Sequence, residues 1–334
     1  MRFSILSVHD HYPNEKRSVN EHYRETLENI VLAEELGFES FWVAEHHFHE
    51  YGTIPNPAVL LAAASQRTTK IGLGVAISVL PFRNPLQAAE DYSMLDNLSN
   101  GRLLLGVGSG YLGHEFSGFG VDQSKKREHF DENFFVLKKA LLGEKISYSG
   151  DYNTIDSVRI NVPTVKKGGP PIYIAALKKE VAYYIGKQGH CMLGIPYATV
   201  EHVNELKDVI IEYKRGWGET FPRLEPPAVN FAFHAHVAET DDDARKGGEE
   251  PFDYYVRTRL YGKSSGWEEI CGRGYCVFGG INTCVNRLHE MAALGIEHVS
   301  LLMDFGYMGQ EKTQKSMRIM AEKVIPKVSQ GSVL

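Results

Sequence analysis

The chain has 334 residues, of which 43% are hydrophobic and 23% charged, and these values are close to the average of globular proteins. They exclude a disordered or fibrous protein, and the length fits either two ordinary domains or one large barrel. A formal net charge of −6 without a basic block argues against nucleic acid or an anionic membrane as the main partner.

Three features of the sequence concern the cellular compartment. The N-terminal apolar run is short and lacks a cleavage-site pattern, which predicts a first strand rather than a signal peptide. The sequence contains no run of about 18 apolar residues that could span a membrane. The four cysteines form neither a Cys-x-x-Cys pair nor a disulfide framework. We therefore expect a cytoplasmic protein with reduced cysteines.

Short apolar runs alternate with amphipathic helical patterns along almost the whole chain. Strands are predicted, in chain order, at 2–8, 39–44, 70–80, 103–107, 172–176, 191–195, 230–237 and 298–303. Helices are predicted between them, among others at 20–36, 57–67, 85–97, 124–142 and 179–187. This alternation predicts a single parallel (β/α)8 barrel of the α/β class, a TIM barrel, over residues 1–334. A Rossmann fold is disfavoured because no Gly-x-Gly-x-x-Gly motif follows the first strand.

Two segments are longer than the connections of a minimal (β/α)8 barrel and are predicted to be insertions. Residues 145–165 carry two alternating segments around Gly150 and Asp151, which predict an inserted β-hairpin. Residues 260–280 are rich in glycine and predict a long loop before the last strand. Such a loop is either a lid over an active site or a disordered excursion.

In a barrel of this kind, catalytic residues lie at the C-terminal ends of the strands. The first strand is followed by His9, Asp10 and His11, and the last one by Asp304. This set raises the alternative of a metal-dependent hydrolase, but it leaves a divalent ion short of ligands. The fourth strand offers only glycines and Ser109 where a bridging ligand would be needed.

The second strand ends in Glu45, His46 and His47, of which one or two can face the mouth of the barrel. Imidazole is the side chain best suited to proton transfer near neutral pH. For His47, packing in a subunit interface is an equally good interpretation. His234 and His236 alternate on the seventh predicted strand, and they face either the lumen or the surrounding helices.

The glycine-rich turn at 106–110 would let a ligand approach the backbone closely. Arg127, near the start of the next predicted helix, offers the bidentate charge that a phosphate group prefers. Lys178, at the start of the helix predicted at 179–187, would add a second cation. The alternative is that residues 125–127 are a solvated basic face.

Five sequence segments carry a resemblance to a known family. They are FWVAEHHFHEYG at 41–52, ISVLPFRNPLQAAEDYSMLDNLSNGRLLLGVGSG at 77–110, SKKREHFDEN at 124–133, PPIYIAALKK at 170–179 and SMRIMAEKVIP at 316–326. In this order they resemble the bacterial luciferase family of flavin-dependent monooxygenases over nearly the whole chain. The resemblance implies a (β/α)8 barrel and FMN that is bound non-covalently in its reduced form. It also implies a separate NAD(P)H:flavin reductase and oxygenation of a small organic substrate by O2 through a C4a-(hydro)peroxyflavin.

The resemblance also implies roles for individual residues. His46 matches the catalytic histidine of the family, and Arg127 matches a phosphate-binding arginine. Ala76 and Ile77 match a non-prolyl cis peptide below the isoalloxazine ring. The implied cofactor-binding residues are Ala76, Ile77, Gly108, Ser109, Gly110, Arg127, Ala176, Leu177 and Lys178. His47 and Glu90 match residues of a subunit interface, which implies a homodimer through the helices predicted at 57–67 and 85–97.

The chain also departs from individual branches of the family. Gly108 replaces a cysteine that lines the luciferase pocket, and Ala232 replaces an arginine of the alkanesulfonate branch, whereas His234 matches a histidine of that branch. Light emission and sulfonate cleavage are therefore not implied. A deazaflavin-dependent oxidoreductase and a non-catalytic flavin-binding partner subunit remain alternatives. An apolar substrate is expected if a group of aromatic residues lines the pocket, namely Phe48, Tyr51, Tyr111, Phe116 and Phe119; the alternative is that they serve only in packing.

Overall fold

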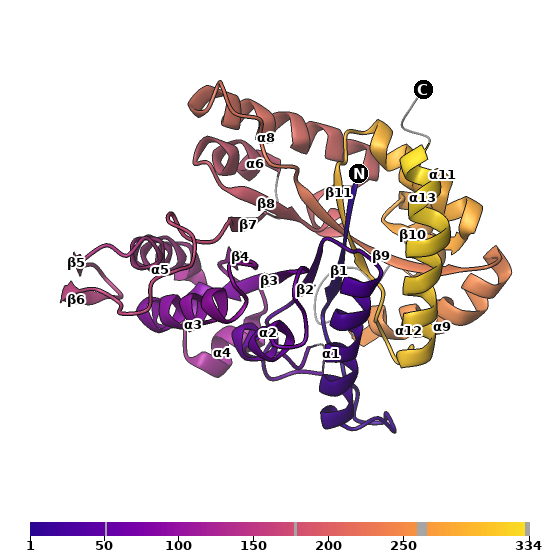
Figure 1. The fold of residues 1–334 in the computed structure, drawn as a ribbon, viewed down its shortest axis with the longest axis horizontal. Coiled ribbons are helices and arrows are strands. Elements are labelled where there is room, and N and C mark those ends of the chain that lie inside the picture. Colours follow the sequence, from indigo (N-terminus) through magenta and orange to yellow (C-terminus); the bar gives the residue numbers. More distant parts are fainter. Residues whose placement is uncertain (51, 177–178, 259–265, 331–334) are drawn as a thin grey trace.

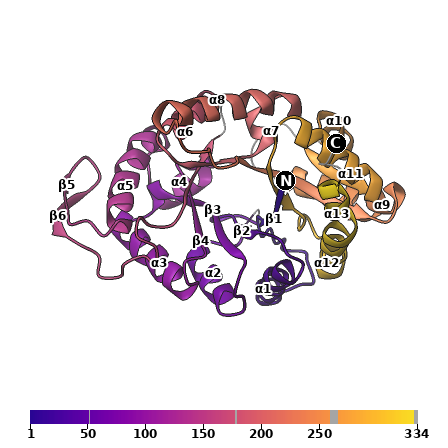
Figure 2. The same ribbon diagram turned by 45° about the horizontal axis from the view of Figure 1, so that its top comes forward.

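The computed structural model describes residues 1–50, 52–176, 179–258 and 266–330. Its parallel strands close into a barrel with helices around it, as Figures 1 and 2 show. The barrel strands are β1 (Arg2–Ser7), β2 (Ser40–Val43), β3 (Gly72–Val79), β4 (Leu103–Gly108), β7 (Ile172–Ala176), β8 (Cys191–Gly194), β9 (Asn230–Ala238) and β11 (His298–Leu302). The ring closes because β11 pairs with β1 on one side and with β9 on the other, while β9 also pairs with β8. The predicted fold class is confirmed.

The helices follow the strands as the periodicity predicts. Those before the hairpin insertion are α1 (Val19–Glu35), α2 (Pro57–Ser65), the 3-10 turn η1 (Leu80–Phe82), α3 (Pro85–Leu98), α4 (Gly113–Phe119), η2 (Gln123–Lys125) and α5 (Lys126–Leu141). Those after it are α6 (Lys179–Lys187), α7 (Pro196–Thr199), η3 (Val203–Glu205), α8 (Leu206–Thr220), α9 (Asp241–Thr258), α10 (Trp267–Arg273), α11 (Ile281–Ala293), α12 (Gln310–Ile319), the π-helical turn η4 (Met320–Val324) and α13 (Ile325–Gln330). None of the helices in the described ranges is long and apolar enough to cross a membrane.

Local sequence explains where the first helices begin. Ser18 caps α1 in a capping box with Glu21, in which each side chain bonds to the other residue's backbone N–H. Asn56 and Asn84 cap α2 and α3, and each is followed directly by a proline in the first turn. Proline is favoured at that position because its missing N–H would have no partner within the helix. These signals place the helices that follow β2 and β3.

The predicted hairpin insertion is confirmed. β5 (Ile146–Ser149) and β6 (Thr154–Val158) pair antiparallel, and both figures show them projecting beside α3 and α5. The carboxylate of Glu132, in α5, accepts hydrogen bonds from the backbone N–H groups of Asp151 (3.0 Å) and Tyr152 (3.0 Å). The hairpin turn is therefore attached to the barrel through α5.

The expectation of a long loop at 260–280 is wrong from Trp267 onwards. Residues 267–273 form α10, and Cys276–Gly280 form a further strand, β10, which pairs with the C-terminal half of β9. Gly274 ends α10 in the left-handed region (φ +76°), where glycine carries no steric penalty. The buried residues Val277 and Phe278 then make the strand. Residues 259–265 lie outside the described ranges.

The lumen is filled at the level of Trp42, which is fully buried. Its indole lies over Gly74 of the neighbouring strand, where an added Cβ would come within 2.1 Å of the ring. It also meets the ring of Tyr173 edge-on, with 4.9 Å between the centroids. Because β2 and β7 are not adjacent in the sheet, this contact crosses the barrel. The lumen below the C-terminal strand ends is therefore a packed core.

Buried histidines make the fold sensitive to acid. Burial lowers the pKa of His9 and His298 to about 3 and that of His190 and His236 to about 4, and it also lowers the pKa of His22. The unfolded chain binds these protons more readily, so the contribution of these histidines to stability is complete above pH 6.5 and is lost as the pH falls from 6.5 towards 4.

We expect a loss of about 1.4 kcal/mol for each of these histidines and each pH unit in that window. Urea unfolding at pH 7 and pH 5.5 measures the loss. In the His236→Gln variant, the free energy of unfolding should depend less on pH, by the contribution of one histidine. A His236→Gln variant with the same pH dependence as the wild type would show that His236 accepts a proton in the folded protein.

Candidate active site

A buried histidine and glutamate pair lies at the C-terminal end of β2. His46 lies three residues after the strand, and its Nδ1 is 3.1 Å from Oε1 of Glu115. Glu115 belongs to α4, the helix that follows β4 in the chain. Glu115 is buried, and the same oxygen accepts the backbone N–H of His47 at 2.9 Å. A carboxylate at Nδ1 keeps the proton of a neutral imidazole on that atom and leaves Nε2 as the basic nitrogen.

A second network fixes the neighbouring residues. His47 Nε2 lies 3.2 Å from Oε1 of Glu45, and the backbone N–H of Val79 donates to the same oxygen at 3.3 Å. The guanidinium of Arg83 lies 3.6 Å from the other oxygen of Glu45. His47 is thus held by its own chain, and its contact with Glu90 of a second copy stays a prediction.

The Ala76–Ile77 peptide is cis, as the resemblance implied. The two residues interrupt the pairing between β3 and β4, and both are partly exposed at the C-terminal half of β3. The side chain of Ile77 lies against Gly108, where an added Cβ would come within 2.1 Å of Cδ1. Any larger side chain at this position would therefore displace Ile77. Ile77 fills the space that the glycine leaves.

The turn after β4 is connected to the start of α5. Lys126 Nζ donates to the carbonyl oxygen of Gly110 at 3.1 Å, and the side chain of Gln123 donates to the carbonyl oxygen of Tyr111 at 3.1 Å. Ser109, Gly110 and Tyr111 are partly exposed. These bonds place the first turn of α5, which includes Arg127, beside the glycine turn.

Arg127 has an exposed side chain, of which 65% is accessible. Its Nε lies 3.0 Å from Asp131, and its two terminal nitrogens make no hydrogen bond to any described residue. It lines a groove of about 400 Å³ whose opposite wall includes Ile174 of β7 and Val181 of α6. An anion at this end of the groove would meet the guanidinium and the start of α6 together.

The remaining cofactor-binding predictions concern the end of β7. Ala176 is the last residue of the strand and is buried, while the adjacent Ala175 is partly exposed. Leu177 and Lys178 lie outside the described residues. The predicted second cation at this site therefore stays a prediction.

The residues of the metal-site alternative do not converge. His9 stacks on His22 with 3.7 Å between the rings, and His11 Nε2 lies 2.7 Å from the carbonyl oxygen of Arg17. Asp10 accepts hydrogen bonds from Tyr12 (2.7 Å) and from the backbone of the loop after β11 (2.8 Å). In the described ranges, no group of three or more His, Cys, Asp or Glu side chains could hold a metal ion.

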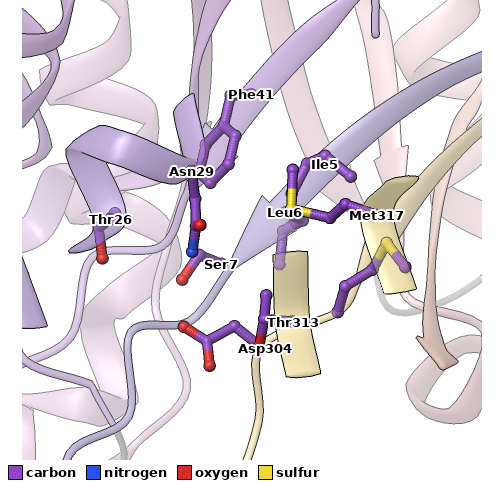
Figure 3. A pocket seen from close by; sticks show the side chains of 10 residues that line it. Ile5, Leu6, Ser7, Thr26, Asn29, Phe41, Asp304, Thr313 and Met317 are labelled. Carbon is purple, nitrogen blue, oxygen red and sulfur yellow. The ribbon is translucent and has the colours of Figure 1, made fainter. Parts of the chain in front are cut away.

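Asp304 instead borders a small cavity between β1, α1 and α12, shown in Figure 3. Its other polar side chains are those of Ser7, Thr26, Asn29 and Thr313. Its volume of about 10 Å³ corresponds to a single water molecule. Burial raises the pKa of Asp304 to about 6.

The two histidines of β9 have different surroundings. His236 packs against Gly247 and Gly248 of α9, so it meets a surrounding helix. His234 is buried among aromatic rings, with the centroids of Phe252 and Tyr255 at 5.1 and 5.3 Å. Both rings also belong to α9, which therefore covers the C-terminal half of β9.

Sequence reasoning missed Glu115 and Lys126 as site residues. Glu115 lies in a short helix with no periodic pattern, and a glutamate there carries no signal for a partner 69 residues away. Lys126 belonged to the run interpreted as a possible basic face, although its ammonium group is bound to the glycine turn. In both cases only the folded chain shows the contact.

Glu115→Gln is expected to lower kcat by about 10–100-fold, because the amide cannot stabilise a charged imidazole as a carboxylate does. Flavin affinity should stay unchanged, since Glu115 acts through His46, and Glu115→Asp should recover part of the rate. Steady-state kinetics and flavin titration measure the two effects. Glu128→Gln, an exposed glutamate of α5, is the matched control. Parallel losses of kcat and flavin binding would indicate a structural role instead.

A closed (β/α)8 barrel with a buried histidine–glutamate pair and an exposed arginine at its C-terminal face has the arrangement of a barrel enzyme, in which the active site lies at that face. The sequence model of the luciferase-like monooxygenases matches residues 1–298. The chain therefore belongs to the luciferase-like monooxygenase family, which confirms the resemblance and the enzyme class, a flavin-dependent monooxygenase.

Individual relatives cover nearly the whole chain. The oxygenase component of a flavin-dependent trigonelline monooxygenase from Acinetobacter baylyi is 24% identical, with 100% of this chain and 97% of that protein covered. The crystal structure of the monooxygenase RslO1 from Streptomyces bottropensis is 26% identical, with a TM-score of 0.88 over 98% of this chain and 99% of that one.

Two less similar structures share the fold. The oxygenating constituent of 3,6-diketocamphane monooxygenase from Pseudomonas putida, solved in complex with FMN, is 18% identical with a TM-score of 0.83. The alignment with it covers 98% of this chain and 99% of that chain. An F420-dependent secondary alcohol dehydrogenase is 19% identical with a TM-score of 0.74, covering 98% of each chain. The barrel alone therefore does not distinguish between FMN and a deazaflavin.

Proposed function

We propose that this protein is the oxygenase of a two-component system, which uses reduced FMN and O2 to oxygenate a small, apolar organic substrate. A separate NAD(P)H:flavin reductase would supply the reduced FMN. The observation that carries the proposal is the position of the buried His46–Glu115 pair and of Arg127 at the same face of the barrel. Reduced flavin, when bound, supplies the electrons with which O2 is activated.

The residues present fit an FMN molecule. Arg127 offers two terminal nitrogens that bond to no described residue, and these could bind the phosphate. The contribution of Leu177 and Lys178 to this end of the site stays a prediction. Small or partly exposed residues would leave room for the ring system at the mouth, namely Ala76, Ile77, Ser109, Gly110 and Ala175, while Gly108 gives space to the side chain of Ile77. His46 would hold or move a proton at Nε2, and the packed lumen below would exclude water.

The proposal of an apolar substrate rests mainly on Tyr111. Its ring meets His46 edge-on, with 6.4 Å between the centroids. Phe116 is buried against Phe82, which indicates a packing role, while Phe48 and Phe119 contact each other at the surface. Tyr51 lies outside the described residues. Among the described residues of the predicted aromatic lining, Tyr111 has its ring edge-on to that of His46.

A homodimer through α2 and α3 is supported by exposed apolar side chains on both helices. Val59 is 67% accessible, and Met94 and Leu98 are 53% and 47% accessible. Glu90 is exposed on α3, where the prediction places a contact with His47 of a second copy. Sedimentation of the wild type and of Met94→Glu would test the dimer.

A deazaflavin-dependent oxidoreductase is the second candidate, supported by the shared barrel of the F420-dependent dehydrogenase. Titration with reduced FMN and with reduced F420 separates the two. A non-catalytic flavin-binding subunit would bind FMN but would not change the reaction of the reduced flavin with oxygen.

Arg127→Ala is expected to weaken the binding of FMN by about 10–100-fold, because charge-assisted hydrogen bonds to one guanidinium contribute about this much to affinity. Riboflavin lacks the phosphate, so its affinity should not change. Anaerobic fluorescence titration measures both ligands, and Arg159→Ala in the exposed hairpin is the control. An equal loss for both flavins, or none for either, would refute a phosphate site at Arg127.

A further inference from the structure

Two cysteines meet at the turn between α10 and β10. Cys271 lies near the end of α10 and Cys276 is the first residue of β10, and their sulfur atoms are 3.4 Å apart. Gly274 reverses the chain between them, with its N–H bonded to the carbonyl of Cys271 (3.1 Å). The sulfur atoms of a disulfide are about 2.05 Å apart, so a shift of a little more than 1 Å would join them.

The two thiols differ in access and acidity. Cys271 is partly exposed, whereas Cys276 is buried. The hydrogen bond from Cys276 lowers the pKa of the Cys271 thiol, and the nearby Arg287 lowers it further. Burial raises the pKa of Cys276. A more acidic, accessible thiol beside a buried one is the arrangement of an attacking and a resolving cysteine.

The other two cysteines have no lowered pKa, although Cys191 is partly exposed like Cys271. Burial raises the pKa of Cys191 to about 11 and that of Cys284 to about 12. Cys284 is fully buried, and its sulfur lies near the backbone carbonyls of Val277 and Gly279. They therefore serve as internal controls for thiol chemistry.

We propose that Cys271 and Cys276 form a peroxide-sensitive modification site that closes to a disulfide. The thiolate of Cys271 attacks one oxygen of hydrogen peroxide, breaks the O–O bond, and gives a sulfenic acid and hydroxide. The thiol of Cys276 then attacks that sulfur; the S–S bond forms, and the hydroxyl leaves as water with the thiol proton. Overall, two thiols and one hydrogen peroxide give one disulfide and two water molecules.

The disulfide would join α10 covalently to β10, the strand that pairs with the C-terminal half of β9. Cys276 pairs with His234 of β9, and Trp267 at the start of α10 stacks on Phe278 of β10 at 4.1 Å. The N–H of Trp267 also donates to Asp253 of α9 at 2.9 Å. Oxidation should therefore restrain α10 and raise the midpoint of thermal unfolding.

The experiment treats the full-length, flavin-free protein with hydrogen peroxide, blocks remaining thiols, and identifies the products by mass spectrometry. We expect loss of two hydrogen atoms, a peptide linked through Cys271 and Cys276, and full reversal by dithiothreitol. Cys276→Ser should instead accumulate sulfinic acid at Cys271, which dithiothreitol does not reverse. Cys271→Ser should slow thiol loss at least about 10-fold, since the more acidic thiol is gone.

Cys191→Ser and Cys284→Ser should behave as the wild type. Retention of four free thiols in excess peroxide, or oxidation that occurs first at Cys191 or Cys284, would overturn the proposal. Because the peroxide is added and no flavin is present, the outcome does not depend on the proposed oxygenase function.

Discussion

His46→Ala is expected to lower the rate of substrate oxygenation by about 10²–10⁴-fold, the usual contribution of a positioned acid–base group. Glu115 lies 3.1 Å from Nδ1 of the imidazole and orients it. The truncation removes this imidazole and leaves the buried carboxylate without its partner. The affinity for FMN should change little, because Arg127 and the glycine turn lie on other elements. Product formation with chemically reduced FMN measures the effect.

His289→Ala, an exposed histidine of α11, is the matched control and should leave the rate unchanged. Wild-type turnover in the His46→Ala variant would show that His46 takes no part in the reaction. A variant that loses flavin binding in parallel would show that the histidine shapes the pocket rather than transferring protons.

Trp42→Ala is expected to reduce the free energy of unfolding by about 3–5 kcal/mol, as for other large aromatic residues in cores. The indole fills the lumen between Gly74 and Tyr173, and its N–H donates to Ser40 at 2.8 Å. Glycine at 74 cannot fill the space that the indole leaves. Urea unfolding followed by circular dichroism measures the change.

Ile211→Ala on the outer face of α8 is the control, because this side chain is 50% accessible and should cost much less. A loss below about 1 kcal/mol for Trp42→Ala would mean that the lumen can collapse around the cavity. The packed lumen would then not be the rigid base on which the site is built.

The barrel could be predicted because each of its strands is a short buried run separated from the next by a helical pattern. The extra strand β10 could not, because the glycines around Cys276 indicated a loop. Pairing with β9, in the register Cys276 to His234, decides its structure. That pairing joins residues far apart in the sequence, and no local pattern reports it.

The site could be predicted where a residue type and its strand end sufficed. His46 was predicted in this way, and Arg127 from the start of the helix after β4. The positions of both on these elements are as expected, and their roles stay predictions. Glu115 was not predicted, since its role depends on the approach of α4 to the end of β2. The orientation of His236 towards α9 was also undetermined, because periodicity gives a common side but not which side.

The reaction of the bound reduced flavin with oxygen tests the proposed function most directly. Protein and reduced FMN are mixed anaerobically, and the complex is then mixed with oxygenated buffer in a stopped-flow spectrometer. We predict a transient spectrum, distinct from reduced and oxidised FMN, whose decay changes in His46→Ala. Oxidation of FMN with the rate and spectra of the free flavin, in the presence of saturating protein, would contradict the assignment as an oxygenase.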